Sequence, residues 1–230
     1  MDSLIKPREY TIVMAILLAS VGVSVYAGVA TSYSDFLRFS SLTIREIHDA
    51  GDGNIALRDG QFAALASGQL WRLFTPTFIH ISLGHLLHNL LFVPWFCARI
   101  EAERGSLAFM LGAGLVAGAA NVSNLIWSGM PFFGGASTLW CAAFGYRGVV
   151  MMANPKSVMA MSAVAIAAAI ASFAIGFLGL VPAANTLHVA ALIVGAALGI
   201  PVAVHERRSM KKQSCTTSAA PEADSHSAGE

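Results

Sequence analysis

The chain has 230 residues, of which 56% are hydrophobic and only 12% are charged, whereas soluble domains carry about a quarter charged residues. This composition excludes an ordinary soluble domain and predicts an all-α polytopic membrane protein, because several apolar stretches approach the ~20 residues that cross a bilayer. The net charge of +1 gives no indication of a nucleic-acid partner, and we expect none; three scattered cysteines make no disulfide framework.

Six membrane spans are predicted in chain order, and the first covers residues 10 to about 30. This segment is too long for a signal peptide and has no convincing cleavage site, so we interpret it as a span. A polar segment, 31–70, separates it from the other five. These are predicted at 83–98, 106–127, 137–153, 157–178 and 186–204.

Lysine and arginine are unevenly divided between the two sides that six alternating spans define. Ten lie on the side of the chain termini and four on the side of the polar segment. The positive-inside rule then predicts cytoplasmic termini and an outer 31–70 loop, in a plasma membrane such as the bacterial inner membrane. The expected parts are a cytoplasmic N-terminus, 1–9, a six-span domain, 10–204, and a cytoplasmic, disordered tail, 205–230.

The predicted spans contain no Asp or Glu. Their absence argues against a carboxylate proton relay or an aspartyl protease, and no His-Glu-x-x-His element indicates a zinc protease. A serine and several histidines remain near the outer ends of the spans, and serine with histidine can form a nucleophile–base pair. The candidate residues are Ser137, His188, His80, His85, His88 and Asn89.

Ser137 follows two glycines in the stretch FFGGASTLW. Glycine permits a sharp turn into a helix, which would place Ser137 in the first helical turn. Free backbone N–H groups and the positive end of the helix dipole would stabilise an oxyanion there. The alternative is that Ser137 serves only as a helix N-cap.

Small residues follow both Ser137 and His188 at helical spacing. They are Cys141, Gly145 and Gly148 after the serine, and Ala191, Gly195 and Gly199 after the histidine. Stripes of small residues let membrane helices pack closely. If the two stripes face each other, the serine and the histidine come within hydrogen-bonding distance.

The chain resembles the rhomboid family of intramembrane serine proteases in several motifs together. The sequence 135–137 resembles the family's Gly-x-Ser element, and His188 with its small residues resembles the family's histidine element. The spacing of His80, His85 and Asn89 is similar to the family's entry to its second span, as are 71–80 and the turn at 100–105. This resemblance covers about residues 70–205 and implies a six-helix rhomboid-like bundle.

The resemblance also implies roles for these residues. Ser137 would attack a peptide carbonyl of a transmembrane protein substrate, and His188 would take up the proton and return it, without a cofactor or metal. His85 and Asn89 would donate hydrogen bonds to the oxyanion, while His80 and Gly135 would support the site. His88 has no counterpart with a known role.

Two positions in the first turn after the serine depart from the family pattern. Thr138 stands where glycine is usual, and Cys141 stands where an aromatic residue often packs on the histidine. The main alternative is therefore a catalytically inactive relative that binds membrane proteins without cutting them.

A small-solute transporter is disfavoured, because neither midplane carboxylates nor repeat symmetry are evident. For the histidines, a polar rim or a metal site is the alternative, although no carboxylate or thiolate joins them.

Overall fold

The structure is a computed structural model that describes residues 9–27, 47–51, 54–57, 62–128, 133–179 and 185–218. The protein is a helical bundle, as the composition predicts. Its long helices are α1 (Thr11–Ala27), α4 (Leu83–Arg104), α5 (Ser106–Ser128), α6 (Ser137–Ala153), α7 (Ala163–Phe177) and α8 (Asn185–Ser218).

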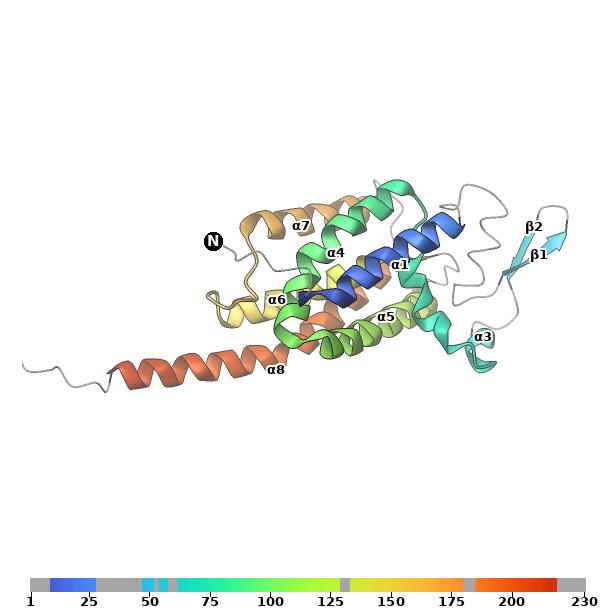
Figure 1. The fold of residues 1–230 in the computed structure, drawn as a ribbon. Coiled ribbons are helices and arrows are strands. Elements are labelled where there is room, and N and C mark those ends of the chain that lie inside the picture. Colours follow the sequence, from blue (N-terminus) through green and yellow to red (C-terminus); the bar gives the residue numbers. More distant parts are fainter. Residues whose placement is uncertain are drawn as a thin grey trace, which may run out of the picture.

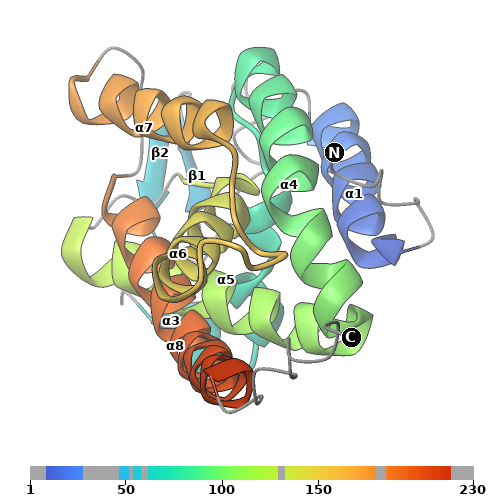
Figure 2. The ribbon, with the colours of Figure 1, turned by 90° about the vertical axis from the view of Figure 1, so that its left-hand side faces the viewer.

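Helix α6 lies at the centre of the bundle. Figure 2 shows α4, α5, α7 and α8 around it, with α1 outside and next to α4. Eleven of the 17 residues of α6 are buried. The helix that begins at Ser137 is therefore held on most sides by other helices.

The pairing of α6 with α8 depends on glycine. A Cβ atom on Gly195 would overlap the Ala142 carbonyl group, and one on Gly145 would overlap the Leu192 carbonyl group. The two backbones therefore touch, as the small stripes predict. Gly148 differs, because a Cβ there would meet no atom within 4 Å.

The surface of the bundle is strongly apolar. Leu18, Val25, Leu91 and Leu111 are each more than half exposed, as expected for side chains that face lipid. Two helical segments are by themselves long and apolar enough to cross a bilayer, Ser106–Trp127 and Asn185–Lys212. Helices α1 and α7 are apolar but shorter.

Three helix boundaries differ from the sequence prediction. Helix α4 continues past residue 98 to Arg104 and ends where Gly105 adopts a φ of 82°. Helix α7 begins only at Ala163, because the Ser162 side chain caps it by accepting a hydrogen bond from the Ala165 N–H. Helix α8 continues to Ser218, so the first part of the expected disordered tail is helical, and 219–230 lie outside the described residues.

The segment before α4 is compactly folded. It contains the short helix α3 (Ala63–Ala66) and two 3₁₀ turns, η3 (Leu70–Leu73) and η4 (Thr75–Phe78). The Asn121 amide of α5 donates to the Leu73 carbonyl at 2.7 Å, which ties η3 to the bundle. The all-α prediction did not include an antiparallel hairpin, β1 (Ile47–Gly51) with β2 (Asn54–Leu57). It lies at the end of the molecule opposite the extended end of α8 (Figure 1).

One buried carboxylate was not anticipated, because the predicted second span ended before it. Glu101 is 1% exposed and accepts the backbone N–H groups of Ile12 and Val13, each at 2.8 Å. Ser106 also donates to it at 2.6 Å. Glu101 therefore caps the start of α1, where a negative charge is favourable.

Arg147, one of the ten cations assigned to the side of the chain termini, is likewise buried. Its side chain projects from α6 and donates to the carbonyl groups of Met159 and Ala160, each at 3.0 Å. Burial of a guanidinium group requires such partners. Arg147 thereby fastens the connection between α6 and α7 to the central helix.

Candidate active site

The turn that leads into α6 is packed against the segment before α4. The Gly135 N–H donates to the Pro76 carbonyl at 2.8 Å. Gly135 has a φ of +116°, a conformation that favours glycine. A Cβ on Gly134 would lie 2.7 Å from the Pro76 oxygen. Glycine at both positions therefore lets η4 and the start of α6 come together.

Ser137 is the first residue of α6, after the N-cap residue Ala136. The N-cap position is thus occupied by Ala136 and not by Ser137, so the N-cap alternative is wrong. Its Oγ instead lies 2.9 Å from Nε2 of His188, which comes from the first turn of α8. The side chain of Ser137 is 3% exposed. A hydroxyl and an imidazole thus meet at the start of two helices that are packed backbone to backbone.

His85 and Asn89 lie on the other side of the Gly135 turn. Nε2 of His85 and Nδ2 of Asn89 are 2.6 and 3.2 Å from the position that a Gly135 Cβ would occupy. Ser82 caps α4 by accepting the His85 N–H at 3.1 Å, and Asn89 follows one helical turn later. Both side chains therefore point from α4 toward the start of α6.

His80 is fully buried beside His85, with 5.1 Å between the ring centroids. Burial lowers the pKa of His80 to about 4, against a smaller opposite effect of the Phe78 carbonyl, so the ring is neutral near pH 7. Its Nδ1 is 3.2 Å from the Phe78 carbonyl oxygen, which can only accept. We therefore assign the proton to Nδ1 and an acceptor role to Nε2.

His88 contacts α7. Its Nε2 lies 3.0 Å from the Ser172 Oγ, and its ring stacks on Phe92 at 4.1 Å. Sequence reasoning found no role for His88, because its partner is 84 residues further along the chain.

Phe173 of α7 lies next to the dyad. Its ring is edge-on to His188 with 6.5 Å between centroids, and it contacts Trp140 at 5.3 Å. Position 141, where the family pattern often has an aromatic residue, is a fully buried cysteine. Here an aromatic side chain from a different helix approaches the histidine instead.

Thr138 is 1% exposed, so its side chain faces neither lipid nor an open cavity. Its Oγ1 has no hydrogen-bond partner among the described residues. The extra methyl and hydroxyl groups are accommodated inside the bundle, while the serine and histidine remain in hydrogen-bonding distance.

The arrangement suits acyl transfer. A hydroxyl nucleophile has a base at 2.9 Å, and two side-chain N–H donors face the same helix start. Within the described ranges, no group of three or more His, Cys, Asp or Glu side chains is placed to hold a metal ion.

Comparison with known proteins gives a consistent result. Residues 67–205, more than half of the chain, match the Rhomboid domain. The chain is 32% identical to Rhomboid protease GlpG of Pectobacterium atrosepticum over 132 residues, which are 55% of this chain and 46% of that protein. It is 30% identical to Rhomboid protease GlpG of Salmonella newport over 142 residues, 61% and 51% of the two chains. Rhomboid-like protease 3 of Toxoplasma gondii is 29% identical over 109 residues, which are 47% of this chain and 40% of that protein. The matches thus span about half the length of these relatives.

Proposed function

Because the chain belongs to the rhomboid family, we propose that it is an intramembrane serine protease that cleaves membrane-protein substrates with a Ser137–His188 dyad. The observation that carries this proposal is the 2.9 Å distance between Ser137 Oγ and His188 Nε2. The protease names of the relatives agree with it.

In the proposed reaction, His188 takes the Ser137 proton while Oγ attacks the scissile carbonyl carbon. His85, Asn89 and the Ser137 backbone N–H donate to the oxyanion as the tetrahedral intermediate forms. His188 then gives the proton to the leaving amine, which leaves an acyl group on Ser137. Water, activated by the same histidine, hydrolyses this ester. Among the described residues, no carboxylate bonds to His188, so the pair acts as a dyad.

The proposed location follows from the cation distribution, with both termini in the cytoplasm and the Ser137 end of the bundle toward the outer side of the membrane. Water would enter the site from that side. Irregular backbone at the Gly135 turn is tolerated in a membrane where it lines a water-filled cavity.

The test uses a serine-directed phosphonate and a substrate with one membrane span. The wild type should be labelled at Ser137 and should cleave the substrate, whereas Ser137→Ala and His188→Ala should each abolish cleavage. The double variant should be no worse than either single variant, because the two residues act as a unit. Undiminished cleavage by Ser137→Ala would refute the assignment of the nucleophile.

The buried Thr138 favours a second candidate function, in which the protein binds membrane proteins without cleaving them. The variant Thr138→Gly distinguishes the two. The protease proposal expects labelling of the wild type and equal or faster labelling of the variant. Labelling of Thr138→Gly alone would show a site blocked by one side chain. Labelling of neither protein, in a folded and inserted state, would leave only the binding function.

A further inference from the structure

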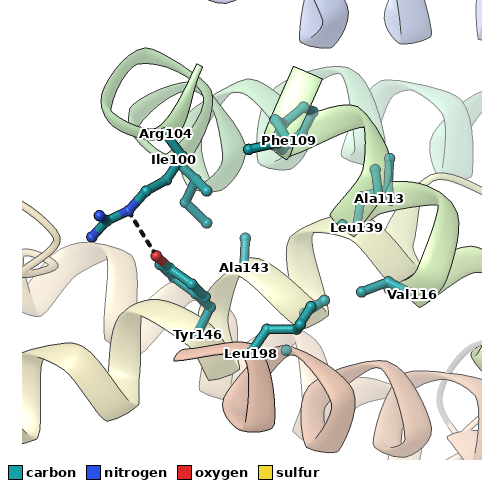
Figure 3. A pocket seen from close by; sticks show the side chains of 13 residues that line it. Ile100, Arg104, Phe109, Ala113, Val116, Leu139, Ala143, Tyr146 and Leu198 are labelled. Atoms are coloured by element: carbon teal, nitrogen blue, oxygen red, sulfur yellow. Dashed lines mark hydrogen bonds between the residues drawn. The ribbon is translucent and has the colours of Figure 1, made fainter. Parts of the chain in front are cut away.

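A groove lies on the face of α6 that points away from Ser137, bounded by α5, α8 and the end of α4. Its volume is about 240 Å³. Helix α6 contributes Leu139, Ala142, Ala143 and Tyr146 to the lining, and these residues share one helical face because of their spacing. Figure 3 shows Leu139, Ala143 and Tyr146 on this face. Ser137 and His188 do not line this groove, so an occupant would not touch the dyad.

The groove is open toward the apolar surface of the bundle. Ala108 and Leu198 on its rim are exposed. A Cβ on Gly112, which also lines the groove, would meet no atom within 4 Å. Acyl chains that surround the bundle in a membrane therefore have direct access.

The length of the groove suits one acyl chain. Along α5 the lining runs from Ala108 to Val116, which is about 12 Å of helix. One leaflet contributes about 15 Å to the hydrocarbon core. The volume is just below the ~300–1,000 Å³ of sites for whole small molecules, which fits a stretch of chain better than a compact ligand.

A cation stands at the mouth of the groove. Arg104 is the last residue of α4, and its Nε donates to the Tyr146 hydroxyl at 2.9 Å (Figure 3). The end of a spanning helix is at the level of the lipid headgroups, where a guanidinium can bind a phosphate through two hydrogen bonds.

Three described carboxylates near this end of the bundle have partners other than Arg104. Glu101 binds the start of α1, Glu103 is 3.5 Å from Arg99, and Glu206 accepts hydrogen bonds from Asn154 and Ser157. The positive charge of Arg104 is thus available to a phosphate at the mouth of the groove.

We propose that the groove binds an anionic phospholipid of the bilayer, with the phosphate on Arg104 and one acyl chain between α5 and α6. This site is separate from the proposed protease site and does not depend on it. The bound lipid would support the back of the helix that carries Ser137.

Native mass spectrometry of the purified full chain tests this proposal by titration with dioleoylphosphatidylglycerol and dioleoylphosphatidylcholine. The wild type should bind the phosphatidylglycerol about fivefold more tightly, the effect of one cation near anionic lipid. Arg104→Gln should remove this preference. Gly112→Leu should weaken the binding of both lipids, because its side chain enters the open space of the groove.

Two controls match these variants. Arg207→Gln removes an exposed arginine of α8 on the same side of the membrane, and Gly22→Leu adds the same bulk on α1, where a Cβ also meets no atom within 4 Å. Both should bind lipid like the wild type. The proposal is overturned by equal wild-type affinity for the two lipids, by a preference that survives Arg104→Gln, or by unchanged binding to Gly112→Leu. Displacement of phosphatidylglycerol by equimolar oleate would also overturn it, since the site would then select a fatty acid.

Discussion

Single residues at the start of α6 decide whether the proposed oxyanion donors and the nucleophile can coexist. Gly135 has no side chain and a positive φ, and the His85 ring occupies the space beside its Cα. Asn89 approaches the same point from the next turn of α4. The glycine therefore does more than form a turn, because its missing side chain leaves room for the histidine.

The first prediction is that Gly135→Ala lowers the cleavage rate at least ~10²-fold, the usual cost of losing one oxyanion donor. The new Cβ would lie 2.5 Å from Cε1 of His85, so this ring must move. Gly84→Ala, in the first turn of α4, is the control, because its Cβ meets no atom within 4 Å. The measurement is the rate of substrate cleavage by protein with an unchanged circular-dichroism spectrum. A wild-type rate for Gly135→Ala would show that His85 is not required where the structure places it.

Helices in this protein are joined by backbone contact and by a few buried polar groups. Apolar side chains alone give little preference for one helix pairing in a membrane, because lipid tails are as apolar as leucine. The glycines between α6 and α8 and the Glu101 carboxylate at the start of α1 supply that preference. The Ser137–His188 distance therefore depends on contacts well away from both residues.

The second prediction concerns the contact between α6 and α8. Gly195→Ala should destabilise the protein by about 1–3 kcal/mol, as overpacking does, because its Cβ would overlap the Ala142 backbone. It should also reduce phosphonate labelling by separating His188 from Ser137. Gly148→Ala makes the same change on α6 where a Cβ meets no atom within 4 Å, and it should be neutral. Thermal unfolding in detergent measures the stability of both variants, and equal melting temperatures would contradict the close contact between α6 and α8.

The third prediction concerns the attachment of α1. Glu101→Ala should lower the free energy of unfolding by about 2–3 kcal/mol, because the N–H groups of Ile12 and Val13 lose a charged acceptor. Glu103→Ala removes a carboxylate two residues away that pairs with the surface cation Arg99, and such exposed pairs contribute little. Protease sensitivity of α1 and thermal unfolding provide the measurement. If the two variants lose equal stability, Glu101 does not hold α1.

We interpret the whole helical bundle as inserting into the membrane as one unit. Only the segments in α5 and α8 are both long and apolar enough to cross a bilayer by themselves, among the helices described. Helix α4 carries His85, His88 and Asn89 and ends in charged residues, and α6 carries Arg147. These polar groups are tolerable in a membrane only because neighbouring helices satisfy or enclose them.

The fourth prediction concerns orientation, which follows from the division of the cations. Reporter fusions after Gly60 should read as outside, and fusions after Lys156 or Gln213 should read as cytoplasmic. A fusion after Arg104, at the end of α4, should agree with the one after Lys156. A cytoplasmic reading at Gly60 would place the Ser137 end of the bundle on the opposite side and would invert the proposed entry of water.

The sequence by itself determined the membrane class and the order of the long helices, and it predicted that Ser137 and His188 would meet if their stripes of small residues faced each other. Span length, helix-start glycines and stripes of small residues are local features, because each can be read along one segment. Tertiary structure alone decided that Phe173 approaches His188, that His88 binds Ser172, and that Glu101 caps α1. Each of these contacts joins distant segments, and it depends on the depth and rotation of two helices relative to each other. Hydropathy does not encode that rotation where every outward face is apolar, so only the packed bundle specifies it.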